Sequence, residues 1–143
     1  MNTYLGVRRI QAEPCDLKGI PGYKVIYANG FEGWVKKDDF GREYFQIERP
    51  DKLCPDDIDR FVAYSGYQYI GVSGKSTLIR AAMISGFQEY EVSSCVDPKN
   101  YSAQIGYENG MKHVKDRLWK MLGFVLQWAD HGLENKEQHS DIA

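Results

Sequence analysis

The sequence predicts an α+β protein with small antiparallel β-sheets and a long C-terminal helical region. Three observations predict this class. An Asn-Gly turn separates two β-rich segments near the N-terminus, further β-rich segments fill the centre of the chain, and apolar residues recur at helical spacing after Asp97. The 143 residues allow one compact domain or two very small lobes.

The first 50 residues predict a β-rich N-terminal lobe. Residues 3–10 have the composition of a strand, and residues 36–46 can add a short helical turn. The clearest signal is residues 23–35, where Asn29-Gly30 lies between two β-forming runs. Both turn residues tolerate positive φ, so the pattern predicts a type I′ hairpin.

Residues 51–132 predict a second domain, followed by a polar tail at 133–143. Acidic residues after Pro55 complement a helix dipole and predict a helix over 55–65. The β section that follows is expected to contain strands 67–72, 77–84 and 87–96, with a turn at Ser85-Gly86 between the last two.

The C-terminal helical region is expected to begin at Asp97-Pro98. Asp97 can cap a helix and Pro98 can occupy its first position. Glycine weakens the apolar repeat, and we expect two helical pieces with a break near Gly123.

Composition excludes several classes of function. The 18 basic and 20 acidic residues give a net charge of -2, which lacks the positive field of a general duplex-DNA binder. The three cysteines fit no zinc or redox spacing. With no signal peptide and no apolar run near the roughly 20 residues of a membrane span, we expect a cytoplasmic protein with free thiols and neither metal nor cofactor.

Two motifs suggest catalysis only weakly. Residues 71–77 resemble the end of a phosphate-binding P-loop, but Tyr69 stands where the full motif requires glycine. A turn between strands is therefore the favoured interpretation. Nothing in the sequence places a cysteine beside His113 as nucleophile and base, so we predict no enzyme and no catalytic residues.

The junction between the last strand and the long helix is the best candidate for a binding site. Free N–H groups at a helix N-terminus favour an anion, and Ser93, Ser94, Asn100 and Ser102 bring polar groups to the same place. Arg117 follows on the helix, accompanied by lysines. Helix capping and a solvated basic face are the alternatives, and both stay open.

A family resemblance adds to this reading. The run from Ser93 to Tyr101, followed by Ile105-Gly106, Leu118-Trp119 and Gly123-Phe124, resembles a small family of tailed-phage proteins. The resemblance covers residues 77–127, and residues 4–46 resemble a segment often found ahead of that domain. The family that this chain resembles includes the phage sponges, proteins that counter the Thoeris defence system by sequestering its signal.

The resemblance implies a homo-oligomer that binds a cyclic ADP-ribose isomer or a cyclic oligonucleotide and sequesters it undegraded. At matching positions it implies that Asn100 and Ser102 meet ribose or base, that Arg117 faces the pyrophosphate, and that Tyr90 stacks on adenine. Arg80 is added as a basic residue on a neighbouring strand. Ser102 replaces the family's commoner aspartate, which puts one hydrogen bond in doubt.

Two further hypotheses come from other functional classes. Aromatic residues of the N-terminal lobe favour a protein-interaction module that inhibits a host protein: Tyr23, Tyr27, Phe31 and Trp34. A nucleotide hydrolase is the least favoured. Recovery of an unchanged ligand, a protein partner or a converted nucleotide distinguishes the three.

Overall fold

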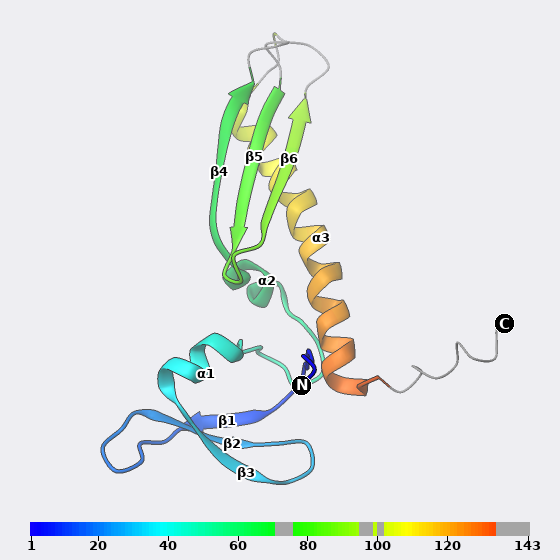
Figure 1. Cartoon of the computed structure of the whole chain (residues 1–143). Coiled ribbons are helices and arrows are strands. Elements are labelled where there is room, and N and C mark those ends of the chain that lie inside the picture. Colours follow the sequence, from blue (N-terminus) through cyan, green and yellow to red (C-terminus); the bar gives the residue numbers. More distant parts are fainter. Residues whose placement is uncertain (71–75, 95–98, 100–101, 134–143) are drawn as a thin grey trace, which may run out of the picture. The chain divides into compact units, whose positions relative to one another are not determined.

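The computed structural model describes residues 1–70, 76–94, 99 and 102–133, without the side chains of residues 68–70. It confirms the α+β class: two three-stranded antiparallel sheets and a long C-terminal helix (Figure 1). The chain divides into two units, which we describe separately. Unit 1 comprises residues 1–46 and 123–143, and unit 2 comprises residues 47–122.

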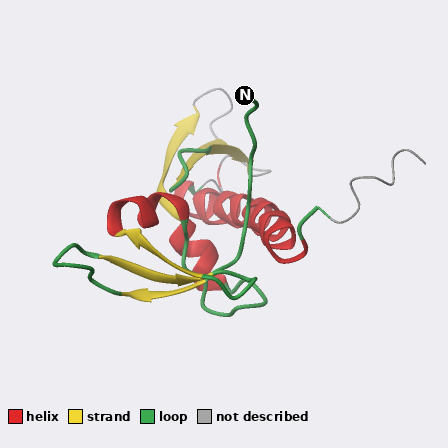
Figure 2. Ribbon diagram, turned by 60° about the horizontal axis from the view of Figure 1, so that its bottom comes forward, coloured by secondary structure: helices red, strands yellow, loops and turns green. Residues whose placement is uncertain are grey.

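Unit 1 contains β1 (Gln11–Pro14), β2 (Gly22–Ile26) and β3 (Glu32–Lys36) in the sheet order β1-β2-β3, followed by α1 (Lys37–Glu43). The helix confirms the predicted helical turn and lies beside this sheet, with the Phe40 ring stacked 3.9 Å from that of Tyr23 (Figure 2). The predicted strand over residues 3–10 is wrong, because the first strand begins only at Gln11. β-Propensity forms no strand where no neighbouring strand pairs with the segment.

The predicted hairpin exists, but its predicted turn type is wrong. Gly30 has φ 85°, whereas Lys18 is the one non-glycine residue with positive φ in the described chain, so Asn29 lacks the conformation of a type I′ turn. The Gly30 N–H donates to the Tyr27 carbonyl and the Tyr27 N–H to the Phe31 carbonyl, both at 2.9 Å. This is a three-residue loop that ends in a left-handed glycine, and it needs only one positive φ.

The same loop recurs at the predicted turn in unit 2. The Gly86 N–H donates to the Met83 carbonyl at 2.9 Å, the Met83 N–H donates to the Phe87 carbonyl at 2.8 Å, and Gly86 has φ 88°. Glycine is the residue that adopts this conformation without a steric penalty.

Unit 2 contains α2 (Pro55–Phe61) and a sheet of β4 (Val62–Ile70), β5 (Ser76–Met83) and β6 (Gln88–Ser94), with β5 in the middle. The three predicted strands are confirmed over the described residues with shifted bounds, and β4 begins earlier than predicted; residues 71–72 and 95–96 of the prediction lie outside the described residues. The predicted helix 55–65 ends early, at Phe61, because Val62 pairs with Met83 and begins β4. Pairing with a neighbouring strand thus overrides the local helical signal.

The core of unit 2 lies between this sheet and α3 (Ala103–His131). Side chains of β5 alternate, and Ile79, Ala81 and Met83 are buried. They form one cluster with Ile58 of α2 and with Met111, Val114 and Leu118 of α3. Gly110 permits the close approach, since a Cβ there would lie 2.3 Å from Cδ1 of Ile79.

The long helix is one piece. The predicted break near Gly123 is wrong, because α3 runs without interruption from Ala103 to His131. A single glycine lowers helix propensity by only about 1 kcal/mol, which packing of the apolar stripe can offset. The predicted cap and first position, Asp97 and Pro98, lie outside the described residues. Among the described helices, none combines the length and apolar character needed to cross a bilayer.

Candidate functional site

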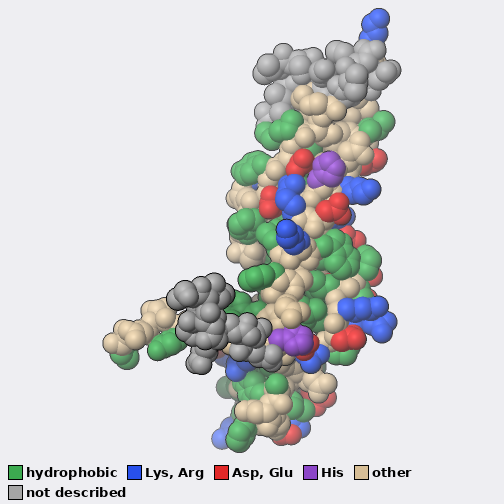
Figure 3. All heavy atoms as spheres, turned by 90° about the vertical axis from the view of Figure 1, so that its right-hand side faces the viewer, with side chains coloured by type: hydrophobic (Ala, Val, Ile, Leu, Met, Phe, Trp, Pro, Cys, Tyr) green, Lys and Arg blue, Asp and Glu red, His purple; other side chains and the backbone are tan. Residues whose placement is uncertain are grey.

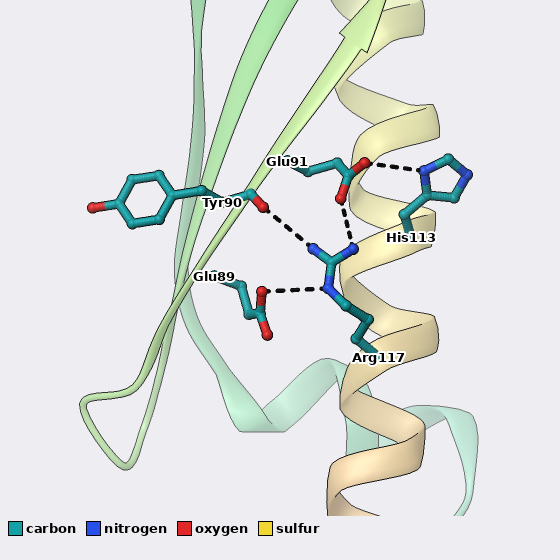
Figure 4. Close-up of polar contacts among 5 residues, drawn as sticks. All are labelled: Glu89, Tyr90, Glu91, His113 and Arg117. Carbon is teal, nitrogen blue, oxygen red and sulfur yellow. Dashed lines mark hydrogen bonds and ion pairs between the residues drawn. The ribbon is translucent and has the colours of Figure 1, made fainter.

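Arg117 of α3 is held against β6 by acidic side chains (Figure 4). Its Nε donates to Oε2 of Glu89 at 3.3 Å and its Nη1 to Oε2 of Glu91 at 2.6 Å. Its Nη2 donates to the Tyr90 carbonyl at 3.4 Å, and Nδ1 of His113 lies 3.4 Å from Oε1 of Glu91. The predicted phosphate-facing arginine is therefore already paired with two carboxylates in this chain.

The electrostatics of this cluster follow from the contacts. The hydrogen bond from Arg117 is the main cause that lowers the pKa of Glu91, and His113 adds to the effect. The same bond raises the pKa of Arg117. Because the Glu89 and Glu91 side chains are only 18% and 20% exposed, their charges are shielded from much of the solvent. The ion pairs of Arg117 with Glu89 and Glu91 therefore favour the ionised forms of the groups on both sides of the α3–β6 contact.

Tyr90 and Arg80 lie on the other face of the sheet. They are direct cross-strand neighbours on β6 and β5, and both are exposed, with 56% of Tyr90 accessible. Gln88 joins them, because its Oε1 accepts from Nε of Arg80 at 3.2 Å and from the Tyr90 hydroxyl at 3.0 Å. An aromatic ring, a guanidinium and an amide thus share one solvent-facing patch, which we call the outer patch.

The pleat of β6 separates the predicted site residues. Glu89 and Glu91 point toward α3 and meet Arg117, whereas the Tyr90 ring points away from the helix (Figure 4). Successive side chains of a strand point to opposite faces, so this separation follows from the register. One chain therefore brings Tyr90 and Arg80 together but leaves Arg117 on the opposite face.

Ser102 has a structural role in the described chain, where its Oγ accepts from the Ile105 N–H at 3.3 Å at the start of α3. This is the capping alternative that the sequence left open. Asn100 lies outside the described residues. The predicted basic face of the helix is mixed in charge, because exposed Glu108, Lys112, Asp116 and Lys120 follow one another at four-residue spacing. Figure 3 shows one face of the molecule on which Lys and Arg side chains lie close to Asp and Glu.

Sequence reasoning missed the acidic and amide neighbours of its own candidates. Glu89 and Glu91 flank Tyr90 at the alternating spacing of a strand, and that pattern could have placed both carboxylates on one face. It also missed a groove of about 660 Å³ between β4 and α3, whose lining includes Tyr64, Ser65 and Trp119. Among the described residues, no His, Cys, Asp and Glu side chains gather in a group that could hold a metal ion.

No curated protein and no solved structure matches the chain. The sequence model of the phage protein (N4 Gp49/phage Sf6 gene 66) family matches residues 53–129, which include all of β4, β5 and β6 and most of α3. The match covers more than half of the 143 residues. The chain therefore belongs to this family of phage proteins.

Proposed function

We propose that this phage protein binds a small cyclic nucleotide signal of bacterial defence and sequesters it without degrading it. The ligand class is a cyclic ADP-ribose isomer or a cyclic oligonucleotide. The observation that carries the proposal is the outer patch, where an exposed tyrosine ring lies beside an exposed arginine on adjacent strands. Membership of a phage protein family is consistent with a protein that acts against bacterial defence.

The chemistry of the outer patch matches that of a nucleotide. An exposed ring can stack on a base, and such stacking contributes about 1–3 kcal/mol per base. The contact with Gln88 uses Nε of Arg80. The Nη1–Nη2 edge of the guanidinium lies outside that contact, and this edge can donate two hydrogen bonds to a phosphate. Gln88 holds both side chains in place, which reduces the ordering cost of binding.

A role for Arg117 in the same pocket requires a second protomer. In one chain Tyr90 and Arg117 point to opposite faces of the sheet. We therefore propose a pocket between protomers of a homo-oligomer, with the outer patch of one copy facing Arg117 of another. The guanidinium keeps its carboxylates there and offers the N–H groups that the contacts with Glu89, Glu91 and Tyr90 do not use.

Calorimetry with cyclic ADP-ribose isomers and cyclic oligonucleotides tests the proposal. We expect stoichiometric binding, chromatographic recovery of the unchanged ligand, and a loss of affinity of about 5- to 150-fold for Tyr90→Ala, the equivalent of one stacked base. Arg80→Ala should lose a comparable factor. Tyr4→Ala is the matched control, because this tyrosine is 87% exposed and lies in unit 1, outside the sheet that carries the outer patch.

Three results would contradict the proposal. If none of these nucleotides gives a heat of binding, the proposed ligand class is wrong. Full affinity in Tyr90→Ala and Arg80→Ala, or equal losses in Tyr4→Ala, would show that the outer patch is not the binding site. Conversion of the nucleotide would instead favour the hydrolase.

A protein-interaction module is the second candidate, and exposed apolar side chains of unit 1 favour it. Phe31 is 72% exposed at the hairpin tip. Three of the four aromatic residues predicted for this role are instead engaged inside the unit. Tyr23 stacks on Phe40, Trp34 donates to the Cys15 carbonyl at 2.7 Å, and the Arg8 guanidinium lies 4.4 Å from the centre of the Tyr27 ring. Recovery of one stoichiometric host protein by the intact chain, abolished by Phe31→Ser, would support this candidate.

A further inference from the structure

The two edges of the β4–β5–β6 sheet differ in how they are protected. Natural sheets protect edge strands with charged side chains, proline, bulges or short length, because an unpaired strand edge is a template for another strand. The β6 edge carries Glu89 and Glu91, both directed at Arg117. The β4 edge has none of these charges: Val62–Ile70 contains no acidic, basic or proline residue.

β4 is also long and regular. Its nine residues exceed those of every other described strand, and its register shift is confined to the first residues, between Val62 and Tyr64. From Tyr64 to Ile70 it pairs with β5 without interruption. Among the described residues, β5 is its one neighbour in the sheet (Figure 1). A long, uncharged and regular edge is suited to pairing with a further strand.

We propose that the free edge of β4 pairs antiparallel with β4 of a second copy of this chain, so that two three-stranded sheets form one continuous sheet. The midpoint of the strand is Gly66. Glycine in a strand interior often marks the close approach of another group. Within the chain that group is the Tyr64 side chain, whose hydroxyl lies 2.9 Å from the position of a Cβ at Gly66, and in the described part of the chain the backbone edge of Gly66 stays open to a second strand. A two-fold axis at Gly66 places this residue opposite itself and places Ser65 of each copy opposite Tyr67 of the other.

The groove beside β4 fits this second copy. Ser65 lines it, and its hydroxyl lies 2.5 Å from that of Tyr107 on α3. Opposite residues of an antiparallel pair point to the same face, so Tyr67 of the second copy would enter the groove next to Ser65. In one chain Tyr67 is 48% exposed although it contacts Tyr107, with ring centroids 5.0 Å apart. Pairing would bury that exposed ring surface.

The charges of the groove are compatible with a two-fold contact. Lys112 and Lys115 line it together with Glu108 and Asp116. In a two-fold interface the same surface meets itself, so a surface that carries both signs can be complementary to its own copy. This contact needs no nucleotide, so its test is made on ligand-free protein. An oligomer that Gly66→Glu leaves unchanged would overturn this contact alone, whereas nucleotide binding by the parent chain tests the proposed function.

Sedimentation analysis of the ligand-free chain tests the proposal. We expect an assembly of at least twice the 16.4 kDa chain mass, and we expect Gly66→Glu to reduce that mass at least twofold. The variant brings two carboxylates together at the axis. Within each chain the introduced side chain would displace the Tyr64 ring, whose hydroxyl lies 2.9 Å from the position of a Cβ at Gly66, and would face Arg80 across the β4–β5 ladder. Val92→Glu is the matched control, because Val92 is 54% exposed on β6, the opposite edge strand. A monomeric parent chain, or an unchanged mass in Gly66→Glu, would overturn the proposal.

A distance measurement covers the case in which Gly66→Glu fails to fold. Spin labels on Gly66→Cys, in a chain whose three cysteines are serine, should be about one strand spacing apart between copies, roughly 5 Å between backbones. Labels on Val92→Cys should be about five spacings apart, or roughly 24 Å across the sheet. Equal or reversed distances would exclude β4 pairing even in a stable dimer.

Discussion

Replacing Arg117 by alanine separates its structural role from any role in binding. The substitution leaves Glu89 and Glu91 side by side on β6 without their shared cation. Removing one member of a fully buried ion pair costs about 3–5 kcal/mol, and an exposed pair contributes about 0.2–1 kcal/mol. Arg117 is 40% exposed, whereas its carboxylates are 18% and 20% exposed. We therefore expect the free energy of unfolding to fall by about 2 kcal/mol.

The loss should depend on pH in a defined direction. Arg117 holds the pKa of Glu91 below its ordinary value. The stabilisation from this group is therefore present above the pKa of Glu91 in the unfolded chain and is lost as pH falls through its lower pKa in the folded chain. We expect Arg117→Ala to differ most from the parent chain at about pH 7, and we expect the difference to shrink as pH falls through the lowered pKa of Glu91.

Urea denaturation at about pH 7 and at a series of lower pH values measures this difference. Lys120→Ala is the matched control, because it removes an exposed positive charge from the same helix and should change stability by less than about 0.5 kcal/mol. A double-mutant cycle with Glu91→Gln isolates the pair. An equal loss at neutral and acidic pH, or a loss no larger than that of Lys120→Ala, would refute the electrostatic account of Arg117.

Two other predictions concern packing and capping. Gly110→Ala should lower the free energy of unfolding by about 1–2 kcal/mol, because its methyl group would meet Ile79. Gly123→Ala should raise it by about 0.5–1 kcal/mol, because a Cβ there would meet no described atom within 4 Å beyond the adjoining helix backbone. Equal effects of the two substitutions in thermal unfolding would contradict this reasoning. Asp57→Ala should lower the free energy of unfolding by about 2–4 kcal/mol, because the buried carboxylate accepts from the Cys54 N–H at 2.8 Å in the α2 capping box. Urea denaturation measures this loss, and a loss below about 0.5 kcal/mol would count against the capping role.

The sequence predicted those elements that depend on interactions within a few residues of the chain. The glycines of both hairpin loops, the acidic start of α2 and the apolar repeat of α3 each act within a few residues, so the sequence contains the reason for the structure. The errors occurred where pairing over a distance decided the outcome. Residues 3–10 have strand composition without a strand to pair with, and residues 62–65 joined β4 rather than α2.

The candidate site shows the same division. The sequence alone determined which residue types are present: an aromatic ring and two arginines near the last strand and the long helix, in a chain of nearly balanced charge. Only the tertiary structure decided which of them share a face. The pleat of β6 and its register with β5 direct Tyr90 to Arg80 and direct Glu89 and Glu91 to Arg117. Side-chain direction depends on strand register and helix packing, and both are set by contacts between residues far apart in the chain.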